Sequence, residues 1–319
     1  MDTLHELSQV IHNNDLMDVA SRMHKSRPML DDIPWYEASD VTSHRFAYDT
    51  TLPAGDWRAY NEGINVETWT GTQARANIGL LESLSQVDKG LYDINPNPDK
   101  YRSQRDLRFA EGMGQTLSTA VLYGDEGLKP NSFNGVTKFF ASLSAEGVYN
   151  AGADSGENGY VTDIFIVQWG QEKVWMAYPR GAGATMGFGR TSYPERMAAV
   201  ASGGFKPVLE TRFTFNCGMV VENPRCIKRI ANLSTLASGD TGKFDEDFLI
   251  EALNDMPNEG AGAVIYMPRN IKTQLDIRAK DKGNAALGWT DIFGRRVLTF
   301  WGTPIRVDES IATSNNVLA

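Results

Sequence analysis

The sequence of 319 residues is poor in cysteine and histidine. Its two cysteines, Cys217 and Cys226, are too few for a disulfide framework and lack the CxxC spacing of a metal site, so we expect two buried thiols. The four histidines all precede residue 45 and are His5, His12, His24 and His44. Because these histidines lie far along the chain from any segment that could form a pocket, we expect surface or interface histidines and neither a metal nor a cofactor.

Long apolar runs and an excess of positive charge are also missing. Apolar stretches such as residues 164–169 have the length of a strand, far short of the roughly 18 residues that a membrane-spanning helix needs. Asp2 and Glu6 stand where a secretory signal carries basic residues, so we expect a cytoplasmic product and no membrane partner. The net charge of -9 argues against binding nucleic acid by general phosphate neutralisation, but it is compatible with a protein that lines a DNA container.

The first part of the chain combines a polar arm with an aromatic hairpin. Residues 1–43 hold only isolated apolar side chains and predict a short helix and an extended arm without a core of its own. Residues 45–52 alternate between polar and apolar and predict a strand, and residues 53–56 form a turn. Residues 57–72 are polar but contain three aromatic residues that are costly to leave in water. Two interpretations stay open: a hairpin folded back on its own domain, or an arm that reaches another subunit. The candidates for intersubunit contact are Phe46, Tyr48, Trp57, Arg58, Tyr60 and Trp69.

The strongest local pattern predicts a helix over residues 98–124, from Pro98 to Gly124, with apolar residues at spacings of three and four. At ~1.5 Å per residue it would be about 36 Å long. Gly112 and Gly114 cost about 1 kcal/mol each in its interior, so we expect another backbone to pack there. Its basic start offers four candidates for contact with packaged DNA, Lys100, Arg102, Arg105 and Arg108. The intervening acids Asp99, Asp106 and Glu111 favour the other interpretation, a solvated face of mixed charge.

The remaining chain predicts a β block followed by a mixed α/β block. Strands at 164–169 and 174–178 flank a turn-like segment, as do strands at 213–221 and 227–233, so we expect two hairpins in one antiparallel sheet. The α/β block contains helices at 245–256 and 269–280 and strands at 263–267, 297–301 and 305–307.

Two glycine-containing loops resemble phosphate sites. Residues 237–244 follow a strand, precede a helix and nearly match the nucleotide-loop pattern [AG]xxxxGK[ST], but Phe244 replaces the hydroxyl residue that ligates Mg²⁺. Residues 181–189 match by composition alone and are not followed by an apolar helix, so we expect a mobile surface loop. A nucleotide-dependent enzyme that uses Lys243 remains an alternative hypothesis.

The order of these parts resembles the major capsid proteins of tailed phages, which share the Hong Kong 97 fold, and in particular their Gp-seven-like branch. The segment that resembles the family's turn after the spine helix is residues 131–135, NSFNG. The segments that resemble its β region and its A-domain are FTFNCGMVVENPRCIKRIANL, AVIYMPRNIKTQL and FWGTPIRVDES. The β segments come before the α/β block, whereas the founding member has its long strands at the C-terminus, so the resemblance implies a permuted connectivity.

The resemblance implies an α+β capsid fold and a structural subunit that is not an enzyme. The expected domains are an N-terminal arm (1–43), an E-loop hairpin (44–90), a P-domain (91–234, with spine helix 99–123 and β sheet 161–233) and an A-domain (235–319). The subunit would form hexamers and pentamers of an icosahedral head around double-stranded DNA, assembled in the host cytoplasm and retained in the virion. Separate scaffolding, portal and decoration proteins would be its partners, and contact with packaged DNA would be weak and nonspecific.

Two further expectations follow from the resemblance. Some members of the family join subunits through an isopeptide bond from a hairpin lysine, but this sequence has no lysine between Lys25 and Lys89, so we expect a noncovalent shell. The alternative within the same fold is an encapsulin-like compartment that encloses cargo enzymes in place of DNA.

Overall fold

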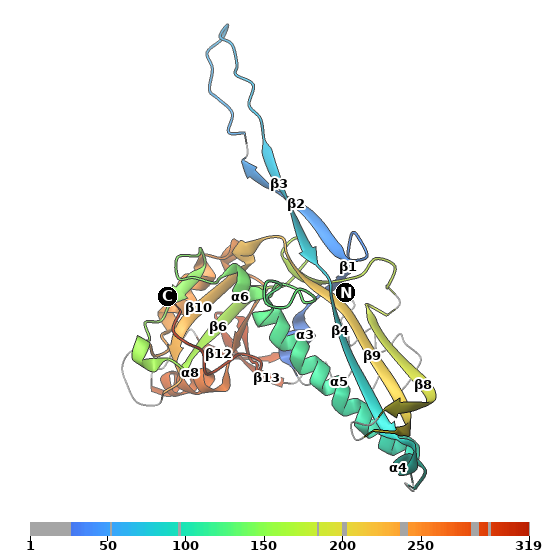
Figure 1. Ribbon diagram of the computed structural model, residues 1–319. Helices are drawn as coiled ribbons and strands as arrows, with labels where there is room; N and C mark the ends of the chain where they lie inside the picture. The colour runs from blue at the N-terminus through green and yellow to red at the C-terminus, as the bar shows by residue number, and fades with distance from the viewer. Residues whose placement is uncertain are drawn as a thin grey trace.

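Two β-sheets and one long helix form the body of the chain (Figure 1). The computed structural model describes residues 27–318 except 52, 95–96, 184, 200–202, 237–241, 282–286 and 293–294. The five-stranded sheet has the order β1-β7-β9-β4, with β8 paired to β9, and consists of β1 (Trp35–Glu37), β4 (Gly79–Asp88), β7 (Val174–Tyr178), β8 (Phe188–Ala199) and β9 (Phe205–Val221). The seven-stranded sheet has the order β12-β13-β14-β11-β6-β10-β5 and consists of β5 (Val148–Asn150), β6 (Val161–Gln168), β10 (Ile227–Ser234), β11 (Ala263–Met267), β12 (Leu287–Ile292), β13 (Arg295–Phe300) and β14 (Thr303–Val307).

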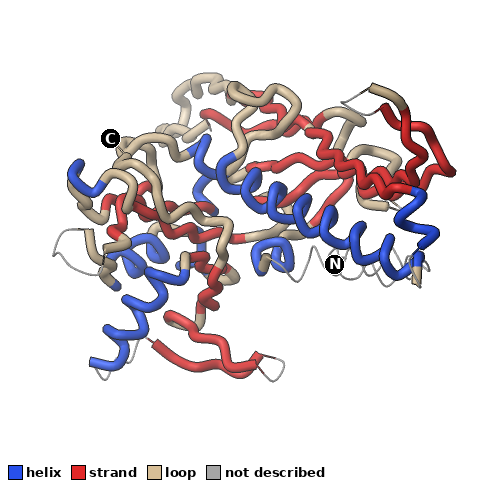
Figure 2. Tube along the Cα trace, turned by 60° about the horizontal axis from the view of Figure 1, so that its bottom comes forward, coloured by secondary structure: helices blue, strands red, loops and turns tan. Residues whose placement is uncertain are grey.

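The helices lie around these sheets, and a two-stranded ribbon leaves them (Figures 1 and 2). The ribbon pairs β2 (Ser43–Thr51) with β3 (Thr70–Asn77). The helices are α3 (Pro28–Asp32), α4 (Lys89–Ile94), α5 (Pro98–Tyr123), α6 (Val136–Phe139), α7 (Glu246–Asn254) and α8 (Arg269–Asp281), with 3-10 turns at Ser155–Glu157, Pro224–Cys226 and Pro257–Gly260.

The predicted helix is α5, which runs along the five-stranded sheet (Figure 2). It buries Ala110, Met113, Leu117 and Val121, the three- and four-residue repeat expected from the sequence. The expectation of a close backbone at Gly112 is wrong, since a Cβ added there would meet nothing within 4 Å.

Close backbone packing occurs instead just past the end of α5. A Cβ on Gly124 would lie 2.4 Å from the Phe133 carbonyl oxygen, and a Cβ on Gly135 would lie 2.6 Å from the Ala120 carbonyl oxygen. The Gly135 N–H also donates to the Gly124 carbonyl oxygen at 2.8 Å. These two glycines let the loop after α5 fold directly against the end of the helix.

The two predicted β hairpins do not form. Antiparallel pairing joins β6 to β10, with Ile227 opposite Val167, and joins β7 to β9, with Val174 opposite Val221. The chain therefore passes from one sheet to the other at residues 169–173 and returns at residues 222–226. Both β6 and β10 are buried along their whole length, as expected for strands covered on both faces of a sheet.

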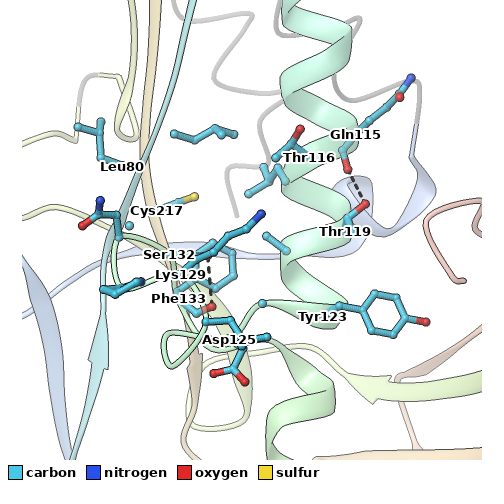
Figure 3. Close-up of a pocket in the computed structure, with 18 of the residues that line it drawn as sticks. Leu80, Gln115, Thr116, Thr119, Tyr123, Asp125, Lys129, Ser132, Phe133 and Cys217 are labelled. Atoms are coloured by element: carbon cyan, nitrogen blue, oxygen red, sulfur yellow. Dashed lines mark hydrogen bonds between the residues drawn. The ribbon is translucent and has the colours of Figure 1, made fainter. Parts of the chain in front are cut away.

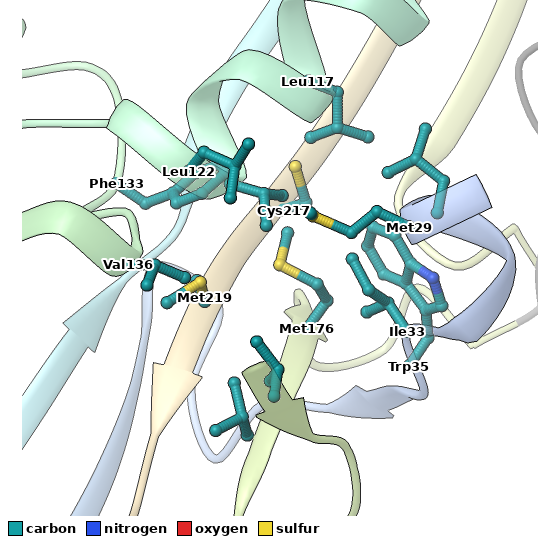
Figure 4. Close-up of a cluster of buried hydrophobic side chains, with 14 of the residues drawn as sticks. Met29, Ile33, Trp35, Leu117, Leu122, Phe133, Val136, Met176, Cys217 and Met219 are labelled. Carbon is teal, nitrogen blue, oxygen red and sulfur yellow. The ribbon is translucent and has the colours of Figure 1, made fainter. Parts of the chain in front are cut away.

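The core continues across the junction of the two sheets. Figure 4 shows the part of it around Leu117 of α5, Met176 of β7 and Met219 of β9. Its buried side chains come from α5, from β7 and β9 of the first sheet and from β6 and β11 of the second. A second cluster lies where α7 and α8 pack on the seven-stranded sheet, around Ile164, Leu249 and Ile271. Since Ile164 and Phe165 belong to different clusters, β6 is covered on both faces.

Part of the expected N-terminal arm belongs to this core. Met29, Leu30 and Ile33 are fully buried, and Trp35 packs against Phe215 with ring centroids 5.3 Å apart. The Met29 N–H donates to the buried Asp308 carboxylate at 3.4 Å. Residues 28–38 therefore make no core of their own, as expected for the arm, but they pack into the core of the body. A short helix, α3, lies within the range 1–43, and residues 1–26 lie outside the described part.

The last third follows the sequence prediction in α7, α8, β11, β13 and β14. Strands β1, β4, β5, β8 and β12 were not predicted. Of these, β4 lies inside the expected E-loop range of 44–90 but pairs with β9 over Gly79–Asp88. The ribbon itself ends at Asn77. Loop 181–189 was expected to be a mobile surface loop, yet its end enters β8 at Phe188 and Gly187 lies against the Asn216 carbonyl, where a Cβ would be 2.3 Å away.

Candidate assembly surfaces

The ribbon of β2 and β3 extends away from the body and carries its tip, residues 53–69, far from both sheets (Figure 1). The tip is held by its own hydrogen bonds: the Gly55 N–H donates to Glu67 Oε2 at 3.0 Å and Arg58 donates to the Glu62 carbonyl at 2.6 Å. Its polar groups are thus partly satisfied within the tip, whereas its large apolar side chains are uncovered. Their exposed fractions are 105% for Trp57, 100% for Tyr60, 66% for Ile64, 93% for Val66 and 65% for Trp69.

The other end of the ribbon is anchored to the subunit. Phe46 is half-buried and packs against the cluster of Ala38, Trp175, Ala177 and Val220. The backbone of Tyr48 pairs with Thr72, and its side chain lies outside the described part of the chain. Among the predicted contact residues, the structure therefore separates Phe46, at the root, from Trp57, Arg58, Tyr60 and Trp69, at or beside the tip.

A groove of about 900 Å³ lies between β4, α5 and the loop that follows α5 (Figure 3). Gly112 and Thr116 line it from the helix, Leu80 from the strand and Lys129 from the loop. Cys217 lies at its inner wall, where burial raises the pKa of the thiol. Both cysteines are buried and free, as predicted. Burial and the raised pKa leave Cys217 as a packing residue.

The basic start of α5 is not one continuous charged surface. Lys100 and Arg108 are exposed, but Arg102 donates to the Glu210 carbonyl at 3.0 Å and to Thr211 Oγ1 at 2.9 Å, which ties α5 to β9. Asp106, expected on a solvated face, is 1% exposed and accepts from Arg190 at 3.0 Å. Arg105 is half-buried. Of the four candidates for DNA contact, Lys100 and Arg108 are the two with exposed side chains.

The position that breaks the nucleotide-loop pattern is a core position. Phe244 is 2% exposed and packs among the side chains between α7, α8 and the seven-stranded sheet. Its N–H donates to Gln274 Oε1 at 3.2 Å and its carbonyl accepts from Arg278 at 2.6 Å. Residues 237–241 lie outside the described part. A side chain at position 244 points into the core, so this loop does not offer a hydroxyl to a metal ion.

No group of three or more His, Cys, Asp or Glu side chains in the described part of the chain could hold a metal ion. Within the same residues, no helix has the length and apolar character needed to cross a membrane.

A buried ion pair that the sequence did not indicate connects the parts of the body. Arg229 of β10 donates to Asp163 of β6 at 2.8 Å and to the Phe140 carbonyl at 2.7 Å. Tyr123, at the end of α5, accepts from the Ala312 N–H at 3.1 Å, and burial raises the pKa of its phenol to about 12. These bonds join the spine helix, the seven-stranded sheet and the C-terminal segment. Such a contact between distant segments has no local sequence signal.

The long helix along one sheet, the projecting ribbon and the second sheet covered by helices make this chain a member of a structural class, the Hong Kong 97-like capsid fold. A bacteriophage Epsilon15 structure is similar with a TM-score of 0.66 and 20% identity, over 90% of this chain and 88% of that chain. The bacteriophage JBD30 capsid gives a TM-score of 0.47 at 10% identity, over 90% of each chain. The SrpI encapsulin complex of Synechococcus elongatus gives 0.43 at 9%, over 66% of this chain and 89% of that chain.

The family is shown by the sequence itself. A family model described as Major capsid protein GP7 matches residues 12–319, so the chain belongs to the Major capsid protein GP7 family and is a major capsid subunit of a tailed phage. No curated protein sequence matches it. Membership confirms the predicted fold class and structural role and indicates the virion as its location. The permuted connectivity stays a prediction.

Proposed function

We propose that copies of this chain form the hexamers and pentamers of an icosahedral phage head that encloses double-stranded DNA. In this proposal the β2–β3 hairpin of each copy lies across a neighbour and buries its tip aromatics there. The observation that supports it is the uncovered tip: Trp57 and Tyr60 are fully exposed beyond the paired strands Ser43–Thr51 and Thr70–Asn77. Aromatic side chains of this size bury 150–250 Å² each when covered, so an assembly that covers them gains substantially.

The division of the chain that accompanies this proposal follows the sheets. The hairpin comprises residues 43–77, and the body with α5 and the five-stranded sheet corresponds to the P-domain. The seven-stranded sheet with α7 and α8 corresponds to the A-domain, and it takes in β6 and β10 from the range first assigned to the P-domain. Residues 28–38 join the body, because their side chains lie in its core.

The remaining parts of the proposal concern partners. Assembly would take place in the host cytoplasm with separate scaffolding, portal and decoration proteins, and the subunit would have no enzymatic activity. Contact with packaged DNA would be weak and would rest on exposed basic residues such as Lys100 and Arg108. An encapsulin-like compartment would differ in its contents, so the nucleic acid content of purified particles separates the two.

The hairpin contact can be tested by assembly. Loss of a large side chain that is buried at an interface removes about 2–3 kcal/mol per contact, or roughly 30- to 150-fold in affinity. We therefore expect Trp57→Ala to raise the protein concentration needed for half-maximal assembly more than tenfold, measured by light scattering and negative-stain microscopy. Trp57→Phe keeps an aromatic ring and should fall between wild type and Trp57→Ala. If Trp57→Ala and Trp69→Ala both assemble within twofold of the wild-type concentration, the hairpin does not carry this contact.

A further inference from the structure

A histidine, His44, lies at the root of the projecting ribbon and contacts the body. His44 Nδ1 accepts a hydrogen bond from the Ser39 N–H at 3.1 Å, and Nε2 lies 3.6 Å from Glu222 Oε1. The imidazole ring also meets the edge of Trp175, with ring centroids 4.8 Å apart. Ser39 belongs to the loop between β1 and β2, Trp175 belongs to β7, and Glu222 directly follows β9. One side chain on the ribbon thus contacts three segments of the body.

The surrounding bonds place this cluster at the point where the ribbon leaves the body. The Ser39 hydroxyl accepts from the Arg45 N–H at 2.9 Å, and the Ile78 N–H donates to the Thr42 carbonyl at 2.9 Å. Beyond His44 the ribbon contacts the body through Phe46, which stacks on the imidazole at a centroid distance of 6.2 Å. A change at His44 therefore acts where the whole 53–69 tip is oriented.

Neutral histidine fits this arrangement and charged histidine does not. A neutral imidazole has one nitrogen that accepts and one that donates, so accepting at Nδ1 places the hydrogen on Nε2, which faces Glu222. Protonation puts a hydrogen on Nδ1 as well, and two donors then oppose each other at the Ser39 contact. The imidazolium gains attraction to Glu222 but loses the bond that ties the β1–β2 loop to the ribbon.

The charged groups around His44 show which form the fold favours. Burial lowers the pKa of His44, and the nearby Glu222 carboxylate opposes this by raising it, with lowering as the net direction. The nearby Asp40 carboxylate accepts a hydrogen bond from the Val41 N–H at 2.8 Å. Arg45 and Arg75 are opposite each other on the ribbon and, by strand alternation, on its other face. With a lowered pKa in the folded protein, the closed root is fully stable above the ordinary histidine pKa of 6.5 and weakens as the pH falls through the folded value.

We propose that protonation of His44 opens the root of the ribbon, so that the hairpin is held in one orientation at neutral pH and released under acid conditions. The opening is a property of the single subunit. Only its consequence for the shell, a weaker hairpin contact between neighbours at low pH, rests on the proposed function.

The test is hydrogen exchange of the full-length chain, read by mass spectrometry at about pH 7.5 and about pH 5 and corrected for the intrinsic pH dependence. In the wild type we expect exchange of the segment that holds the Ser39 and Arg45 amides to rise roughly tenfold at the lower pH, the effect of losing one such bond. His44→Asn keeps an acceptor near the Nδ1 position but does not titrate, so its root should stay protected at both values. Glu222→Gln removes the charge that favours protonation, so across a series of pH values between these two the midpoint of its exchange transition should lie lower than in the wild type.

Each outcome decides the proposal. Corrected exchange at the root that is equal at the two pH values in the wild type would overturn it, and so would an acid-dependent rise of the same size in His44→Asn. An unchanged midpoint in Glu222→Gln would also count against it. Failure of the proposed function would appear elsewhere: exchange of residues 53–69 would not slow on assembly, whatever the root does.

Discussion

Replacing Asp163 by asparagine tests the buried ion pair that joins β6 to β10. The Asp163 side chain is 2% exposed and that of Arg229 is 9% exposed, so the change leaves a guanidinium charge without its counter-ion and without solvent. Breaking a buried pair by neutralising one partner costs about 3–5 kcal/mol. Asparagine keeps the shape and an acceptor oxygen, so we expect the lower end of this range, about 3 kcal/mol.

The assay is urea unfolding of the full-length chain, followed by tryptophan fluorescence. With an m value of about 3 kcal/mol per M, a loss of about 3 kcal/mol lowers the midpoint by about 1 M. The matched control is Glu82→Gln, which breaks the ion pair of Glu82 with Arg212 between β4 and β9. Both of its side chains are more than one third exposed, so the midpoint should not change measurably.

A double-mutant cycle separates the ion pair from simple loss of shape. Adding Arg229→Met to Asp163→Asn removes the uncompensated charge, so the double variant should lose clearly less stability than the sum of the two single changes. Strict additivity, or a midpoint shift in Asp163→Asn no larger than that of Glu82→Gln, would refute the reasoning. If Asp163→Asn fails to fold, soluble yield in the double variant provides the same comparison.

Three further predictions concern two glycines, the 237–244 loop and covalent links between subunits. Gly218→Ala should abolish soluble protein, because its Cβ would lie 2.3 Å from the Asn77 carbonyl oxygen. Gly112→Ala has nothing within 4 Å of its Cβ and should raise the free energy of unfolding in urea by up to about 1 kcal/mol. Equal effects of the two changes would contradict the packing described. Phe244→Thr completes the nucleotide-loop pattern, but it empties a buried position and should lower the free energy of unfolding by about 3 kcal/mol or more. Calorimetry should detect no ATP binding to this variant, and saturable binding would reverse this conclusion. Mature particles should run as monomers on a denaturing gel, since the sequence has no lysine between Lys25 and Lys89, and a ladder of linked subunits would show otherwise.

Local patterns accounted for the elements whose signal is contained in one segment. The helix at Pro98–Tyr123 was predicted within one residue, because the spacing of Leu117 and Val121 and the residues that begin and end a helix are local properties. The strand at Ala263–Met267 and the helix after it were predicted for the same reason. The pairing of strands was predicted wrongly, since short connections at 170–173 and 222–225 are as compatible with a hairpin as with a crossing between sheets.

The contact surfaces divide in a similar way. The aromatic content of residues 57–69 indicated that these side chains need cover, but the sequence left open whether the same subunit supplies it. The structure separates the two cases residue by residue, with Phe46 packed at the root and Trp57 exposed at the tip. The anchoring role of Arg102 and the pairing of Asp106 with Arg190 had no sequence signal, because their partners lie more than 80 residues away along the chain.

The sequence by itself determined the order of arm, aromatic hairpin, spine helix, β block and α/β block, and with it the family and the structural role. The order follows from helix periodicity and strand alternation, which are properties of short segments. The family and the structural role follow from the resemblance of the sequence to the Major capsid protein GP7 family. Only the tertiary structure decided which sheet each strand enters, that residues 28–38 pack into the core, and that His44 contacts the body at the root of the hairpin. Those outcomes depend on contacts between distant residues, whose free energy comes from packing and desolvation that no single segment contains.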